Sequence, residues 1–355
     1  MNIIAPGRIC LFGDHQDYLE LPVIACAINR DVCLSSEENE TGQFHIRMPD
    51  IQSERIISID DTFPLLEVGD HFASAIRVVR RNGCIPNIGF DIELKSTIPI
   101  NAGVSSSSAI VVAWIHFLLK AYGSNRKLTA PFIAQLAYEA EVLEHNSPGG
   151  KMDQYTIALG NIIYIDTNQN FSFEKIGTEM DGLILGVSGI PKKTIGLLGE
   201  LKGKAQKAIA QVKAANPKFN LEETTIAEIE SLSEYVSEEL QPYFYAAIKN
   251  HHITQQAQQH FKKTPPNLKT IGTLMSEHHN VLKNTLKITV PRIDNMISAA
   301  LKAGAYGAKI VGSGGGGSIV ALSPLHNKLA VINAIKKAGA IDAYEVSVVK
   351  GTYIL

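Results

Sequence analysis

The sequence predicts an α+β fold of two domains, and three observations indicate it. The chain has 355 residues, which on the usual size of a domain corresponds to about two of them. Strand-like segments dominate its beginning, whereas helical segments fill most of residues 194–303 and strands close the chain. The predicted boundary lies between residues 170 and 180, which gives domains of residues 1–175 and 176–355. Hydrophobic residues make up 45% of the chain, enough for a core in each domain.

The N-terminal half reads as a series of strands followed by helices. Alternating or continuous apolar segments predict strands at residues 2–5, 9–12, 23–34, 43–48, 55–59 and 88–96. Helices are predicted at residues 72–81, 109–122 and 131–145. In the last of these, Pro131 stands in the first turn, where its missing N–H group does no harm. Ile133, Leu136 and Ala140 then recur at helical spacing and predict one apolar face.

The C-terminal half reads as mostly helical. Strands are predicted at residues 161–166, 183–188, 308–311, 318–322 and 343–351. Helices are predicted at residues 194–215, 225–240, 243–260, 266–285, 291–303 and 327–339.

Composition excludes several classes of function. The net charge is −2, so no general basic field points to nucleic acid. The longest apolar run, residues 109–119, is far shorter than the roughly 20 residues that span a membrane. The start of the chain lacks the basic and apolar segments of a secretory signal, and the four cysteines show no metal-binding or disulfide spacing. We therefore expect a cytoplasmic protein that binds neither nucleic acid nor membrane; whether it is a monomer or a dimer stays open.

A serine-rich loop at residues 98–109 is the most informative segment, and we call it the serine loop. It follows a predicted strand and opens a predicted apolar helix. A helix N-terminus carries free N–H groups and a partial positive charge, and small residues there let an anion approach closely. The segment therefore predicts a phosphate site, with an ordinary serine-rich helix cap as the alternative. It has neither the P-loop pattern nor the glycine pattern of dinucleotide-binding folds.

A polar segment at residues 6–18 lies between apolar strand residues. Arg8 is suited to hold a phosphate or a carboxylate. Asp14, His15 and Asp17 are short polar side chains that suit recognition of a ligand with many hydroxyl groups. A polar hairpin turn is the alternative, and the His-X-Asp spacing alone lacks the further ligands of a zinc site.

Two more segments carry candidate site residues. Residues 312–317, which we call the glycine loop, hold five glycines, more than a simple hairpin needs. We expect something to approach this backbone closely, with a flexible turn as the alternative. Glu141 lies near the end of a predicted helix, and Asp153 begins an apolar segment after the turn at Pro148-Gly149-Gly150. A carboxylate at a helix start is more often only a cap.

Taken together, these segments resemble the GHMP kinases, and within them most of all the galactokinases. Residues 7–18, GRICLFGDHQDY, resemble the galactokinase pattern GRxNLIGEHTDY. Residues 150–154, GKMDQ, resemble GIMDQ, with Glu141 and Pro148 at the matching upstream spacings. Residues 272–280, residues 290–294 and the glycine loop also resemble mevalonate kinases and support the wider family rather than a particular substrate.

The resemblance implies a fold and a reaction. The N-terminal domain is expected to resemble an α/β domain of a ribosomal protein and the C-terminal domain to be ferredoxin-like, with the active site in the cleft between them. The implied reaction transfers the γ-phosphate of ATP, with Mg²⁺, to the anomeric hydroxyl of galactose or a related sugar. A mevalonate-type kinase and a non-catalytic sugar sensor are the alternatives.

The resemblance also implies roles for individual residues. The triphosphate would be wrapped by the serine loop through Gly103, Val104, Ser105, Ser106, Ser107 and Ser108. Magnesium would be held by Ser106 or Ser107 together with Glu141. Asp153 would be the catalytic carboxylate, with Arg8 beside it. The sugar would contact Asp14, His15, Asp17 and Gly150, and the glycine loop would close over it through Gly314, Gly315, Gly316 and Gly317.

Three positions depart from the galactokinase pattern. Leu19-Glu20-Leu21 stands where galactokinases have Asn-Gly-Gly, and Asp14 stands where they have the longer Glu. Lys151 replaces an apolar residue two positions before Asp153; we expect it to face solvent, with a pairing to Glu20 or a contact with an acidic sugar as alternatives. These departures leave the expected kinase reaction intact and leave the identity of the sugar open.

Overall fold

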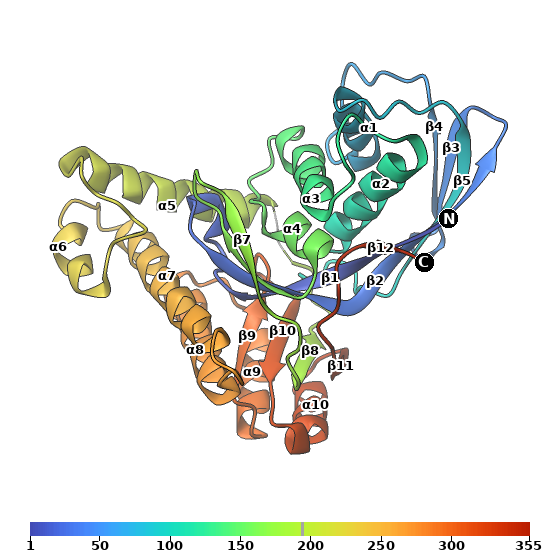
Figure 1. Ribbon diagram of the computed structural model, residues 1–355. Coiled ribbons are helices and arrows are strands. Elements are labelled where there is room, and N and C mark those ends of the chain that lie inside the picture. Colours follow the sequence, from blue (N-terminus) through green and yellow to red (C-terminus); the bar gives the residue numbers. More distant parts are fainter. Residues whose placement is uncertain (193–194) are drawn as a thin grey trace.

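The computed structural model describes residues 1–192 and 195–355, which form two sheets and a lobe of helices (Figure 1). The first sheet has eight strands. They are β1 (Asn2–Phe12), β2 (Val23–Asn39), β3 (Gln43–Met48), β4 (Ser53–Ser58), β5 (Gly89–Ser96), β6 (Ile162–Asp166), β7 (Ser172–Gly177) and β12 (Tyr353–Ile354).

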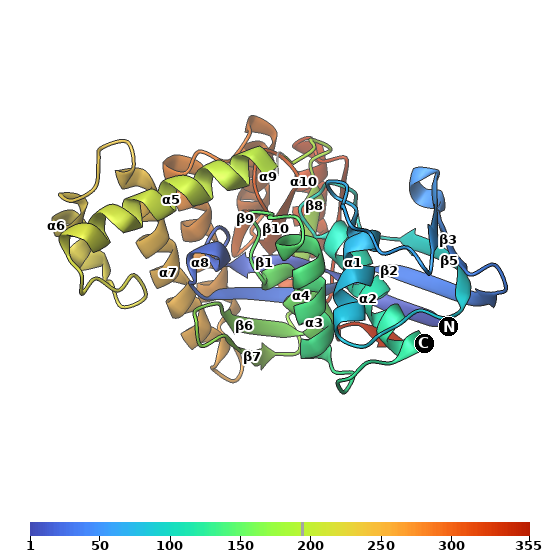
Figure 2. The same cartoon turned by 90° about the horizontal axis from the view of Figure 1, so that it is seen from above.

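Strand β2 organises the first sheet because it is long enough to serve several partners. It pairs antiparallel with β1 along one edge. On the other edge, its beginning pairs with β6 and its end with β5. Four helices cover one face of this sheet, as Figures 1 and 2 show. They are α1 (His71–Arg81), α2 (Ser106–Tyr122), α3 (Ala130–Tyr138) and α4 (Met152–Leu159).

Helix α2 lies at the centre of the N-terminal core. Its apolar residues are buried on nearly all sides, because the sheet lies under it and helices flank it. Trp114 contacts Phe44 of β3 edge-to-face and stacks on Phe117, and all three are fully buried. This packing fixes the helix axis, and with it the position of the serine loop from which the helix starts.

The second sheet confirms the expected ferredoxin-like arrangement. It contains β8 (Leu183–Val187), β9 (Gly307–Val311), β10 (Ser318–Leu322) and β11 (Asp342–Glu345) in the order β11-β8-β10-β9, all antiparallel. A helical connection follows β8, and α10 (Lys328–Lys337) follows β10, which gives the βαββαβ pattern of that fold. Helix α9 (Pro291–Lys302) packs with α10 against this sheet (Figure 1).

A helical lobe is inserted between β8 and β9. It holds α5 (Ile195–Ala215), α6 (Ile229–Ser233), α7 (Gln241–Phe261) and α8 (Leu268–Asn280). Phe244, Ile248 and Val212 belong to its small core. Leu21, which follows the polar segment of residues 6–18, packs into the same core. The lobe therefore contacts the segment that follows Asp17.

The end of the chain returns to the first sheet. After β11, single bridges join Val348 to Ile28 and Lys350 to Gly160, and β12 then pairs with β1. The predicted domain boundary at residue 175 falls within β7, which belongs to the first sheet. The exact position of the boundary stays a prediction.

Several predicted elements differ from the structure. The helix predicted at 225–240 is wrong, since a 3-10 turn (Ile226–Glu228) and short α6 are followed by turns with few buried residues. The helix predicted at 131–145 ends at Tyr138 and continues as a π-helix, Glu139–Leu143. Strand β7 was not predicted because its side chains are mostly exposed on both faces and give no alternating pattern. The strand predicted at 343–351 ends at Glu345, and Thr194, the predicted first residue of a helix, lies outside the described residues.

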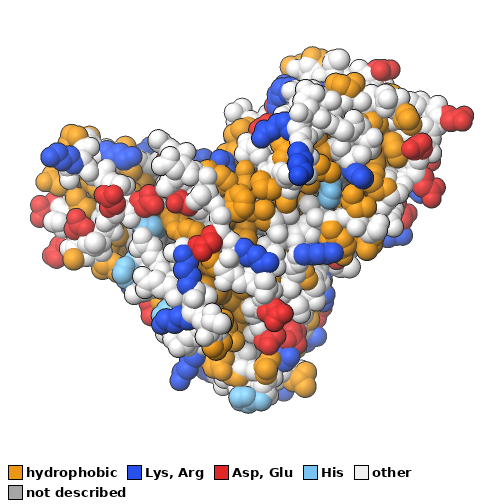
Figure 3. All heavy atoms as spheres, in the orientation of Figure 1, with side chains coloured by type: hydrophobic (Ala, Val, Ile, Leu, Met, Phe, Trp, Pro, Cys, Tyr) orange, Lys and Arg blue, Asp and Glu red, His pale blue; other side chains and the backbone are white. Residues whose placement is uncertain are grey.

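Nowhere in residues 1–192 and 195–355 is there a helix with both the length and the apolar character needed to cross a membrane. On the face seen in Figure 3, basic and acidic side chains are interspersed.

Candidate active site

The centre of the candidate site is an ion pair between residues far apart in the sequence. Arg8 of β1 donates from Nε to Asp153 Oδ1 at 2.7 Å and from Nη2 to Asp153 Oδ2 at 2.8 Å. The Arg8 side chain is 5% exposed and that of Asp153 is 26% exposed, so the carboxylate can be reached from solvent while the guanidinium is enclosed. Burial opposes ionisation of Asp153, but the charge and hydrogen bonds of Arg8 outweigh it and lower its pKa.

The serine loop contributes directly to this pair. Ser105 donates from Oγ to Asp153 Oδ2 at 2.5 Å, and Gly103 accepts a 2.5 Å hydrogen bond from Arg8 Nη1. Val104 accepts from the backbone N–H of Arg8. Ser105 has a φ of 60° and directly precedes α2, so the loop turns sharply and leaves the helix N-terminus free of side-chain caps. The serine-rich cap considered for this loop is therefore absent at Ser105, whose hydroxyl is used on the carboxylate instead.

Glu141 lies beside this pair on the π-helix. Its Oε1 accepts from Ser108 Oγ at 3.0 Å, and its Oε2 accepts from Gln154 Nε2 at 2.6 Å. Burial raises the pKa of Glu141. The wider turn of a π-helix shifts the residues that follow it, and such turns are frequent at functional sites.

The polar segment supplies a second side of the site. Lys309 of β9 donates from Nζ to Asp14 Oδ2 at 2.5 Å and to the carbonyl oxygens of Cys10 and Ile310 at 3.1 and 2.9 Å. Asp14 and Lys309 are both buried, and Gly312 N–H donates to Asp14 Oδ1 at 3.3 Å. Asp14 also lines the central cavity, so its contact with a sugar hydroxyl stays a prediction alongside these protein partners.

His15 and Asp17 have different electrostatic states. Burial lowers the pKa of His15 to about 4, and its Nδ1 lies 3.1 Å from the hydroxyl of Tyr18. Burial and the nearby charge of Asp153 raise the pKa of Asp17 to about 6. A Cβ at Gly150 would lie 2.2 Å from Asp17 Oδ2, so only glycine allows this close approach.

These groups surround one cavity of about 160 Å³. Nine of the predicted site residues line it: Arg8, Asp14, His15, Asp17, Ser107, Ser108, Glu141, Gly150 and Asp153. Ser106 does not line it, nor do Gly314, Gly315 and Gly316.

The excess of glycine in the glycine loop has a different cause from the one expected. A Cβ at Gly103 would lie 2.5 Å from Val311 O, and one at Gly312 would lie 3.0 Å from Gly103 Cα. Gly314 approaches Ile288 O, and Gly316 approaches Ile190 O, in the same way. The backbone that comes close is therefore the protein's own. Gly312 and Ser313 are the residues of this loop that line the cavity, and the contact of Gly314 to Gly316 with substrate stays a prediction.

Several residues that line the cavity were not predicted from the sequence, and three of them lie outside the motifs or interrupt one. Lys192 follows β8 and lines the cavity, near enough to Asp153 and Glu141 for their charges to affect its pKa, which burial lowers. Ser313 lies in the glycine loop, and Leu198 is on α5. Lys192 and Leu198 gave no signal because both lie in a segment without a recognisable motif, whereas Ser313 was visible as the one residue that interrupts the glycines.

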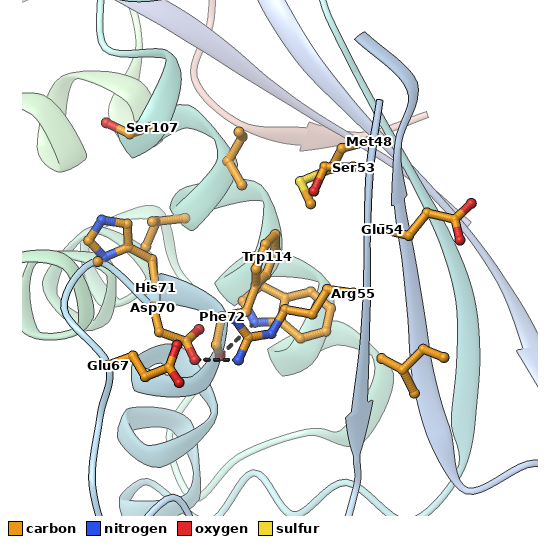
Figure 4. Close-up of a pocket in the computed structure, with 14 residues that line it drawn as sticks. Met48, Ser53, Glu54, Arg55, Glu67, Asp70, His71, Phe72, Ser107 and Trp114 are labelled. Atoms are coloured by element: carbon orange, nitrogen blue, oxygen red, sulfur yellow. Dashed lines mark hydrogen bonds and ion pairs between the residues drawn. The ribbon is translucent and has the colours of Figure 1, made fainter. Parts of the chain in front are cut away.

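A second cavity of about 650 Å³ adjoins the serine loop. Figure 4 shows Ser107 at one side of it, with Phe72 and Trp114 deeper and Arg55 paired with Asp70. Its apolar lining also includes Met48, Ile110 and Val111. Ser107 lines both cavities, so the start of α2 connects them.

Of the departures from the galactokinase pattern, Asp14 lines the central cavity, whereas the other two lie outside it. Leu19, Glu20 and Leu21 line a separate surface cavity with Asn168 and Lys213. Lys151 places its Nζ 4.3 Å from the ring centroid of Phe171 and 5.5 Å from that of Tyr138. Neither the pairing of Lys151 with Glu20 nor full exposure of Lys151 is observed; it makes cation–π contacts instead.

Asp17→Asn is expected to change how stability depends on pH. The pKa of Asp17 is raised from 3.8 to about 6, so the folded protein holds a proton in that window that the unfolded chain has released. The free energy of unfolding therefore falls as pH rises through the window. The variant has no carboxyl group at this position and so does not show this decrease. In urea unfolding, the free energy of unfolding of the variant minus that of the unchanged protein should therefore rise between about pH 4 and pH 7. A stability difference that stays constant with pH would contradict the assignment.

A free helix N-terminus beside a carboxylate–guanidinium pair, in a fold of two domains, suits the binding of phosphate and its transfer to a small molecule. Residues 70–161 match the GHMP kinases N terminal domain, residues 257–341 match the GHMP kinases C terminal domain, and residues 2–35 match the galactokinase galactose-binding signature. The chain belongs to the GHMP kinase family, whose members use ATP as phosphate donor.

Relatives of two activities are similar to it. The mevalonate kinase of Thermococcus sibiricus is 28% identical, with 95% of this chain and 93% of that protein covered. The galactokinase of Pasteurella multocida is 27% identical, with 93% and 87% covered. The crystal structure of Lactococcus lactis galactokinase complexed with galactose has a TM-score of 0.89 at 22% identity, covering 100% of this chain and 95% of that one. The resemblance to the family is thus confirmed, and the similarity does not separate the two substrates.

Proposed function

We propose that this protein is a sugar kinase that transfers the γ-phosphate of ATP to the anomeric hydroxyl of galactose or a related neutral sugar. The observation that carries this proposal is the absence, within the described residues, of a free cation on the side of the cavity formed by Asp14, His15 and Ser313. Mevalonate is a carboxylate, and a carboxylate in an enclosed site needs a cation or several N–H donors.

The charge state of that side supports a neutral acceptor. Lys309 has three N–H donors, and all three are used on Asp14, Cys10 and Ile310. His15 is neutral near pH 7 because its pKa is about 4. Lys192 is a cation of this cavity, and the charges of Asp153 and Glu141 affect its pKa. It therefore lies near those carboxylates, on the side where phosphate would react. Hydroxyl groups therefore suit the side of His15 better than a carboxylate does.

The larger cavity suits the nucleoside of ATP. It offers aromatic and aliphatic surface from Phe72, Trp114 and Ile110, with polar groups at its rim, and it meets the serine loop at Ser107. A nucleotide with its base there would direct its phosphates along the N-terminus of α2 towards Arg8 and Asp153.

Magnesium fits the groups around Glu141. Mg²⁺ prefers oxygen ligands and is commonly held by one or two carboxylates together with substrate phosphates. Glu141 with the hydroxyl of Ser107 or Ser108 would hold it, because both hydroxyls lie in the same cavity as the carboxylate. Bound there, the ion would supply neutralisation of phosphate charge.

The side chains then divide the work of phosphoryl transfer. The bond from the acceptor oxygen to the γ-phosphorus forms, and the bond from that phosphorus to the bridging oxygen of ADP breaks. Arg8 and Lys192 would neutralise charge on the transferred group. Asp153, with its lowered pKa, is a weak base, so it orients the acceptor hydroxyl and receives its proton late in the transfer.

The test is turnover of the purified protein with magnesium-ATP, followed by release of ADP. The acceptors are galactose, glucose, galactosamine, N-acetylgalactosamine, galacturonate, glucuronate, fucose, arabinose and mevalonate. We expect turnover on a neutral sugar, with mevalonate and the uronates at background. Turnover on mevalonate alone would replace the proposal with the mevalonate kinase function, which the Thermococcus relative favours. Sugar binding without ADP release on any acceptor would indicate a sensor.

A further inference from the structure

Ser313 occupies an unusual position in the glycine loop. Gly312 and Gly314 on either side of it have φ values of 85° and 89°, which favour glycine, whereas Ser313 is not in that region. Its backbone lies close enough to the His15 ring to affect the pKa of that ring. A side chain is therefore sterically allowed at this position alone in the loop, and it faces the central cavity.

The hydroxyl of Ser313 is buried, yet it has no hydrogen-bond partner among residues 1–192 and 195–355. The same is true of His15 Nε2, and both residues line the central cavity. A third such atom of the cavity, Gln154 Oε1, belongs to a side chain that is held on Glu141. Buried polar atoms are nearly always paired, so the unpaired atoms of His15 and Ser313 indicate a ligand group that pairs with them.

The contacts of His15 indicate which kind of group this is. When the hydroxyl of Tyr18 donates to His15 Nδ1, the neutral ring carries its proton on Nε2, which is then a donor. The hydroxyl of Ser313 can accept. A ligand hydroxyl satisfies both, because it accepts from His15 and donates to Ser313. A carboxylate oxygen could accept from both groups, but it would place a negative charge beside a neutral imidazole and a hydroxyl with no cation among the described residues to pair with it, which is costly in an enclosed site.

We propose that Ser313 Oγ and His15 Nε2 together bind one hydroxyl of the acceptor other than the one that is phosphorylated, which makes Ser313 a specificity-determining residue. This inference rests on the proposed sugar kinase function and deepens it. It makes Ser313, the one residue of the glycine loop that is not glycine, responsible for distinguishing a sugar from its deoxy analogue.

The test compares Ser313→Ala with the unchanged protein on the preferred sugar and on its singly deoxygenated analogues. For the preferred sugar, we expect the variant to lose about tenfold in kcat/KM, mainly through KM, with KM for ATP unchanged. For one deoxy analogue only, the variant and the unchanged protein should have equal kcat/KM, because that analogue lacks the hydroxyl that Ser313 would bind. The preference for the parent sugar over that analogue should therefore fall about tenfold.

Ser318→Ala is the matched control. Ser318 Oγ is also buried and unpaired within the described residues, but this serine lies in β10 and does not line the cavity. It should leave KM for the sugar unchanged. If the unchanged protein phosphorylates a sugar and Ser313→Ala alters no deoxy preference, the inference alone is overturned. If the unchanged protein phosphorylates mevalonate and no sugar, the proposed function fails and this inference with it.

Discussion

Asp153→Asn is expected to lower turnover by about 10²–10⁴-fold, the range found when a group that handles the reacting proton is removed. Asparagine keeps the shape of the side chain but has no charge for Arg8 and cannot accept the proton of the acceptor hydroxyl. ATP affinity should change little, because the nucleoside cavity and the start of α2 are built from other residues. Steady-state ADP release and calorimetric titration with magnesium-ATP measure the two effects separately.

The control for this variant is Asp342→Asn. Asp342 lies on β11 and forms a 3.0 Å surface ion pair with Lys336, away from the central cavity. It should keep full turnover. If Asp153→Asn also keeps full turnover while folded, Asp153 has no role in the reaction. The resemblance of residues 150–154 to the GIMDQ pattern is then misleading at this position.

Lys309→Met is expected to lower the free energy of unfolding by about 3–5 kcal/mol, the usual cost of removing one partner from a buried ion pair. Methionine retains most of the volume of lysine, so the loss comes from leaving Asp14 buried and ionised without its cation. Urea unfolding measures the effect.

Asp14→Asn combined with Lys309→Met should recover part of the loss, because the double variant buries no unpaired charge. Lys336→Met removes a lysine from an exposed pair and should cost no more than about 1 kcal/mol. Equal losses in the two lysine variants would show that the Asp14–Lys309 pair contributes no more than a surface pair.

The sequence pointed to residues that come together in the structure where local chemistry was distinctive. Arg8, Glu141 and Asp153 were proposed from short motifs, and the structure brings them around one cavity. It did so less well where residues acquire their roles by packing. Lys309 reads as one more strand residue, and only the pairing of β9 in the second sheet and its approach to β1 make it the partner of Asp14.

The glycine loop illustrates the same limit. Its composition correctly indicated a close approach of backbone, but a count of glycines says nothing about which backbone approaches. Because Gly103 and Gly312 belong to different domains, their contact is formed only when the two domains pack together.

The sequence alone determined the kind of protein, because the serine loop, the polar segment and the glycine loop each carry recognisable chemistry in a short stretch. The tertiary structure alone decided how these stretches meet. It placed Asp14 beside Lys309, packed the glycines against the protein's own backbone, and brought the unpaired polar atoms of His15 and Ser313 to one cavity. The physical reason is that hydrogen bonds and ion pairs act over a few ångströms in space, whereas their partners here are up to 299 residues apart in the chain.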